Sequence, residues 1–120
     1  MIIVVEDDKF TLDCFVDILS RDTEVVGFAD PELFCEYCED HKDKVSCAEA
    51  IILDYWFDFY NIGHKELVLY IRENLNFKGK ILLFTHENEI SDQTVKNIDG
   101  FLPNKKILCY KAIKTQFLLS

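Results

Sequence analysis

The sequence predicts an α/β fold in which one parallel sheet of five strands, in the order 2-1-3-4-5, is covered on both faces by helices in a three-layer, doubly wound (βα)5 sandwich. Apolar runs of strand length alternate with amphipathic segments of helix length along the 120 residues. The runs are apolar almost without interruption, which is typical of strands buried on both faces and so of a parallel sheet. Right-handed crossovers then favour double winding.

Each strand is expected where a short apolar run occurs between polar segments. The runs are rich in Ile, Val, Leu and Phe, which favour strands. We expect strands at 2–6 (IIVVE), 24–28 (EVVGF), 48–54 (AEAIILD), 80–85 (KILLFT) and 100–102 (GFL).

Each helix is expected where apolar residues recur at helical spacing after a capping residue. Asp8 is suited to cap the first helix, and Asp30 followed by Pro31 is a good start for the second. The helices are expected at 8–20, 30–41, 64–75, 90–98 (a short helix) and 106–119. Two buried stripes are predicted, formed by Leu12, Phe15 and Leu19 and by Leu67, Ile71 and Leu75.

The length and the charge of the chain exclude several classes of function. A chain of 120 residues with 49% hydrophobic residues suggests one domain spanning 1–120. The net charge of −9 argues against nucleic-acid and anionic-membrane surfaces on this domain. No apolar run approaches the roughly 20 residues that span a bilayer. No basic leader precedes Ile2, so we expect a cytoplasmic protein.

The five cysteines form an odd and dispersed set, which favours reduced thiols over a disulfide framework. Cys35 and Cys38, followed by His41, have a spacing that occurs in zinc sites. A second pair of ligands is missing, and the two cysteines lie in a predicted helix, where residues three apart share a face. We therefore favour a packing role for both thiols.

Polar residues follow four of the predicted strands. Glu6 and Asp7, with Asp8 next, end the first strand, Asp54 ends the third and Thr85 ends the fourth. Lys105 and Lys106 follow the fifth strand. Because the carboxyl ends of parallel strands meet at one edge, these groups are expected to converge there.

Crowded carboxylates repel one another unless a cation neutralises them. A few carboxylate oxygens suit Mg²⁺, which keeps several waters and leaves room for a phosphate oxygen. An aspartate beside Mg²⁺ can attack a phosphoryl group, while a lysine and a hydroxyl stabilise the transferred charge. This chemistry explains why an apolar strand would end in Asp54.

Four segments together resemble the response-regulator receiver domains of two-component signalling, the CheY-like family with a flavodoxin/CheY-like fold. They are IIVVEDD for the first strand and acidic pair, IILDYW for the phosphoacceptor strand, ILLFTH for the strand ending in Thr, and GFLPNK for the strand leading to a lysine. The resemblance covers the whole chain.

The resemblance implies a Mg²⁺ site made by Glu6, Asp7, Asp54 and the backbone carbonyl of Trp56. It implies that Asp54 is the phosphoacceptor toward a phosphohistidine on a sensor histidine kinase or phosphotransfer protein. Such a domain is no enzyme beyond its own self-catalysed phosphotransfer and dephosphorylation.

The resemblance also implies a switch. Thr85 and Lys105 would contact the phosphoryl oxygens, and movement of Thr85 would couple to Phe101. The reshaped surface would be read by a downstream effector or output domain. The sequence leaves a homodimer through the last helix open.

The sequence departs from the family pattern in three places. No Met-Pro pair follows Asp54, and His86 stands where a small residue is usual. Lys105 is followed by Lys106 rather than proline, while Pro103 comes earlier, so either lysine could contact the phosphate; we prefer Lys105.

Other functions remain to be distinguished. The acidic residues could be a solvated turn and helix cap in a degenerate pseudo-receiver that binds proteins without phosphorylation. A Mg²⁺-dependent phosphatase would usually need an acid two residues after Asp54, where Trp56 stands. A flavodoxin-like cofactor site would need Gly, Ser or Thr in the first turn rather than acids.

Overall fold

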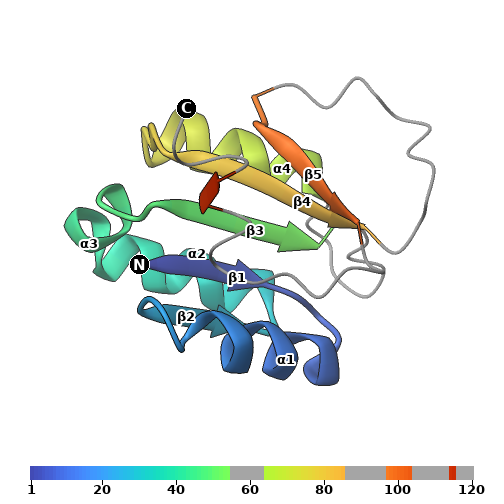
Figure 1. Ribbon diagram of the computed structural model, residues 1–120. Helices are drawn as coiled ribbons and strands as arrows, with labels where there is room; N and C mark the ends of the chain where they lie inside the picture. The colour runs from blue at the N-terminus through green and yellow to red at the C-terminus, as the bar shows by residue number, and fades with distance from the viewer. Residues whose placement is uncertain (55–63, 86–96, 104–113, 116–120) are drawn as a thin grey trace.

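A computed structural model describes residues 1–54, 64–85, 97–103 and 114–115. Its described strands form one parallel sheet in the order β2-β1-β3-β4-β5, which confirms the predicted fold class (Figure 1). The strands are β1 (Ile2–Val5), β2 (Val25–Phe28), β3 (Ala50–Asp54), β4 (Lys80–Thr85) and β5 (Gly100–Pro103).

The two helices after β1 and β2 begin as expected. Helix α1 (Lys9–Leu19) starts after Asp8, whose side chain accepts the N–H of Thr11. Helix α2 (Pro31–Asp40) starts after Asp30, whose side chain accepts the N–H of Glu32. A carboxylate at this position satisfies a backbone donor that has no partner inside the helix.

The structure differs from the predicted elements in two described segments. A short helix, α3 (Lys42–Ser46), follows α2 directly and had not been predicted. The single helix expected over 64–75 is α4 (His64–Leu69) followed by a π-helical turn, η1 (Tyr70–Asn74). The turn is closed by the N–H of Leu75, which donates to the carbonyl of Tyr70.

The last two predicted helices lie largely outside the described residues. Of the helix predicted at 90–98, the described end is not helical, since Asn97 has a φ of 69°. Of the helix predicted at 106–119, the structure describes residues 114–115 alone, and these are helical.

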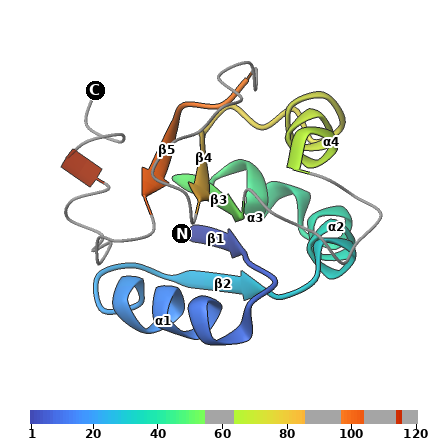
Figure 2. The same cartoon turned by 90° about the vertical axis from the view of Figure 1, so that its right-hand side faces the viewer.

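Apolar residues fill the space on both faces of the sheet. Helix α1 covers one face, while α2, α3 and α4 cover the other (Figure 2). On the first face the predicted stripe of Leu12, Phe15 and Leu19 is buried against β1 and β3. On the second, Phe34, Val45, Leu67 and Ile71 are buried, and Leu75 is partly buried. The core thus holds the strands rigidly and fixes the positions of their ends.

Candidate functional site

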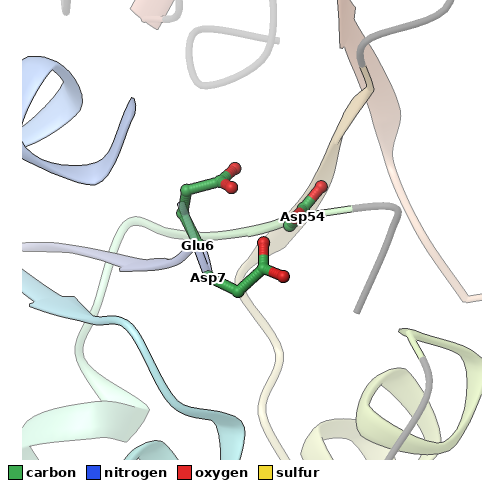
Figure 3. Close-up of side chains that lie close together, drawn as sticks. All are labelled: Glu6, Asp7 and Asp54. Atoms are coloured by element: carbon green, nitrogen blue, oxygen red, sulfur yellow. The ribbon is translucent and has the colours of Figure 1, made fainter. Parts of the chain in front are cut away.

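Three carboxylates meet at the carboxyl ends of β1 and β3. These strands pair in parallel with Val5 opposite Leu53, so the residues that follow them reach the same edge of the sheet. One carboxylate oxygen from each of Glu6, Asp7 and Asp54 lies within 4.8 Å of the other two (Figure 3). The sequence placed these residues at strand ends, and the structure brings them together.

Two of the three carboxylates are withdrawn from solvent. Glu6 is 1% exposed and Asp54 is 2% exposed, while Asp7 is partly exposed. Glu6 Oε1 accepts the N–H of Asp8 at 3.1 Å. Its other oxygen, Oε2, is buried and has no hydrogen-bond partner among the described residues. A buried carboxylate oxygen without a hydrogen-bond donor destabilises the fold. A proton or a cation bound at this oxygen would remove that cost.

Burial raises the pKa of Glu6 from its ordinary value of 4.5 to about 7. The Asp8 N–H and the Asp54 side chain favour a lower pKa, and the nearby Asp7 favours a higher one. In the protein without metal we therefore expect this carboxyl to be partly protonated near neutral pH. A divalent cation would replace that proton, and an all-oxygen, all-carboxylate donor set fits Mg²⁺.

Asp8 follows the two acids but has another role. Its Oδ2 accepts the N–H of Thr11 at 3.2 Å and the Thr11 hydroxyl at 2.5 Å. The side chain thus caps α1, and it is not a member of the carboxylate cluster.

The Asp8→Ala variant is expected to lose about 1 kcal/mol of folding free energy, because the first turn of α1 loses its cap. Urea unfolding measures this loss, and Asp8→Asn should retain most of the stability since Asn also caps. Mg²⁺ affinity should change little in either variant. If Asp8→Ala abolished Mg²⁺ binding, Asp8 would have to be a ligand.

Comparison with solved structures shows which known domains share this fold. The chain is similar to the N-terminal domain of an uncharacterized protein from Wolinella succinogenes, with 23% identity, a TM-score of 0.70, and 95% of this chain and 88% of that chain covered. It is similar to the receiver domain of NtrX from Brucella abortus, with 16% identity, a TM-score of 0.73, and 88% and 87% covered.

A third structure is the isolated REC domain of RcsB from Salmonella enterica serovar Typhimurium, determined with the phosphomimetic BeF3⁻. The identity is 18%, the TM-score is 0.66, and 88% of this chain and 77% of that chain are covered. The chain has the receiver-domain fold. No protein-family model matches the sequence, and no match was found among curated proteins.

The structure describes some of the other predicted site residues of this receiver fold and not others. Thr85 ends β4 at the carboxyl edge, with its backbone opposite Pro103, and Phe101 lies in β5 opposite Leu83. Trp56, Lys105, Lys106 and His86 lie outside the described residues. Their predicted roles stay predictions.

The two cysteines of α2 pack in or against the hydrophobic core of the receiver fold. Cys38 is fully buried in the core, and Cys35 packs partly buried against it. His41 ends α2, with its ring stacked on Tyr37 at 4.3 Å between centroids. Across the described ranges, Glu6, Asp7 and Asp54 are the one set of His, Cys, Asp and Glu residues with the geometry to share a metal ion.

In the described part of the chain, every helix lacks the length and apolar character needed to cross a membrane.

Proposed function

We propose that this chain is a response-regulator receiver domain that accepts a phosphoryl group on Asp54 in a Mg²⁺-dependent reaction in the cytoplasm. The observation that carries the proposal is the buried cluster of Glu6, Asp7 and Asp54, in which Glu6 Oε2 lacks a donor among the described residues. Buried charged groups stabilise a fold less than apolar side chains of similar volume would, so the cluster is better explained by binding than by stability.

Glu6, Asp7 and Asp54 would hold the metal ion, with the carbonyl of Trp56 as a fourth protein ligand. When bound, Mg²⁺ would supply positive charge that offsets the charge of the carboxylates and of an incoming phosphoryl group. Asp54, at the end of rigid β3, would keep its oxygen aimed at the phosphorus. Two neighbours in the solved structures, RcsB and DrrB, have receiver domains studied with BeF3⁻, which supports a phosphate-mimic experiment here.

The reaction transfers a phosphoryl group between two side chains. An oxygen of Asp54 forms a bond to the phosphorus of a phosphohistidine, on a sensor histidine kinase or phosphotransfer protein, while the P–N bond breaks. The electron pair of that bond stays on the imidazole nitrogen. Thr85 and Lys105, or Lys106 in its place, would contact the phosphoryl oxygens. Hydrolysis of the acyl phosphate would return Asp54 to its free carboxylate.

The phosphorylated state would be read by an effector or output domain. We propose that Thr85 shifts toward the phosphoryl group and that Phe101 follows, which changes the surface next to β4 and β5.

Trp56 provides the test, since it is the sole tryptophan and stands two residues after Asp54. Its fluorescence is followed while Mg²⁺ is titrated, with and without beryllofluoride, in the wild type and in Asp54→Asn. We expect a saturable change with Mg²⁺ and a further change with beryllofluoride that the variant lacks. The exposed carboxylate variant Glu36→Gln is the matched control and should behave like the wild type.

The opposite result is equally informative. A folded wild-type protein that responds to neither Mg²⁺ nor beryllofluoride would overturn phosphoryl acceptance. A pseudo-receiver that binds partners without phosphorylation would then explain the fold better. A beryllofluoride response retained in Asp54→Asn would mean that a different residue is the acceptor.

A further inference from the structure

A second polar network surrounds Arg72 of η1. Its guanidinium donates from Nη1 to the carbonyls of Phe77 (2.9 Å) and Gly79 (2.8 Å), from Nε to the carbonyl of Asn97 (2.9 Å), and from Nη2 to Oδ2 of Asp99 (2.9 Å). Two of these acceptors precede β4 and two precede β5. One side chain therefore connects the helical layer to the beginnings of two neighbouring strands.

Asp99 extends the network into the sheet. Its Oδ2 also accepts the N–H of Ile81 at 2.8 Å, and its own N–H donates to the carbonyl of Ile81 at 2.8 Å. The ammonium of Lys80 lies 4.0 Å from its Oδ1. The side chains of Arg72 and Asp99 are 20% and 29% exposed, so water competes weakly for these contacts.

The network depends on the shape of arginine. A guanidinium presents five N–H groups in a rigid plane and can serve acceptors on several sides, whereas a lysine ammonium is a compact point charge. If β4 or β5 separated at this end, the guanidinium, the carboxylate and several backbone carbonyls would lose their hydrogen-bond partners at the same time.

This network and the carboxylate cluster lie at opposite edges of the sheet. All five strands run in the same direction, so the start of β4 is at the edge away from Asp54. At the usual rise per residue of a strand, β4 separates its two ends by roughly 16 Å.

We infer that the Arg72–Asp99 network is a fixed anchor, which holds the amino-terminal ends of β4 and β5 in place while the carboxyl-terminal ends respond to the site. The part of the inference that concerns a response rests on the proposed phosphoryl acceptance. The anchor itself rests on the contacts of Arg72 and Asp99 alone.

Amide hydrogen exchange, followed residue by residue by NMR, tests the anchor. In Arg72→Ala, protection of the Ile81 and Asp99 amides is expected to fall by about tenfold to a hundredfold, because both depend on the position of Asp99. Arg72→Lys should show a smaller loss. Arg21→Ala is the matched control and should leave both amides unchanged, because the exposed Arg21 lies just after α1 and pairs with Asp17 at 3.3 Å.

The wild type is then compared with and without Mg²⁺ and beryllofluoride. We expect exchange to change at the amides of Leu53 and Asp54 and to stay constant at Ile81 and Asp99. Protection at Ile81 that changes together with Asp54, or wild-type protection in Arg72→Ala, would overturn the anchor. If no amide responds to beryllofluoride, phosphoryl acceptance is overturned, and the Arg72→Ala result alone decides the anchor.

Discussion

At pH 8 and without metal, the Glu6→Gln variant is expected to be more stable than the wild type by about 3 kcal/mol. The reason is that Glu6 is 1% exposed and lies beside two other carboxylates, so its ionisation opposes folding. The separation between its ordinary pKa of 4.5 and about 7 in the fold corresponds to about this free energy. The neutral amide of glutamine can instead donate to the neighbouring carboxylates.

The sign of the pH dependence follows from a raised pKa. The favourable contribution of protonated Glu6 is fully present below pH 4.5 and is lost as the pH rises through about 7. Urea unfolding in EDTA between pH 4.5 and 8 should therefore show a decline in wild-type stability that Glu6→Gln reduces. A decline of equal size in Glu6→Gln would assign it to another group. The exposed control, Glu36→Gln, should follow the wild type.

Adding Mg²⁺ should narrow the difference in stability between the two proteins. In the wild type at pH 8, the cation would offset the repulsion and raise the free energy of unfolding. Glu6→Gln has lost a charged ligand, so its Mg²⁺ affinity should be weaker by roughly tenfold or more. Equal stabilisation of both proteins by Mg²⁺ would place the ion elsewhere.

Replacing Phe34 by alanine is expected to lower the free energy of unfolding by about 3–5 kcal/mol. The ring is fully buried on the inner side of α2 and meets Phe28 edge-on, with 5.8 Å between centroids. Alanine would leave a cavity that rigid strands cannot close. Folding free energies of small domains are about 5–15 kcal/mol, so this loss would be a substantial fraction of the total.

Urea unfolding followed by circular dichroism measures the effect of Phe34→Ala. The neighbouring Leu33 is the matched control, because it lies on the same helix turn and is 53% exposed. Leu33→Ala should cost less than about 1 kcal/mol. Similar losses in the two variants would mean that α2 does not pack as described.

The strands and the carboxylate cluster were predictable because both depend on local pattern and on one general rule of parallel sheets. Apolar runs give the strands, and a parallel sheet brings the residues after β1 and β3 to one edge. Those two facts are enough to bring Glu6, Asp7 and Asp54 together. The predicted roles of Trp56 and Lys105 concern residues outside the described ranges and stay predictions.

The missed features depend on contacts that no local pattern encodes. Helix α3 has five residues, of which Val45 alone is buried, so it carries no helical periodicity. The π-helical turn interrupts a segment whose Leu67 and Ile71 have ordinary helical spacing. Arg72 and Asp99 are 27 residues apart in the chain. An arginine on a helix and an aspartate before a strand are both common, so neither residue alone indicates that the two form a pair.

Both outer strands of the described sheet, β2 and β5, are four residues long. An outer strand exposes backbone N–H and C=O groups that another copy could pair with, and a short one offers few of them. The net charge of −9 adds repulsion between copies. Edge-to-edge polymerisation into extended sheets is thus disfavoured, which protects a chain rich in β-forming residues from aggregation at high concentration.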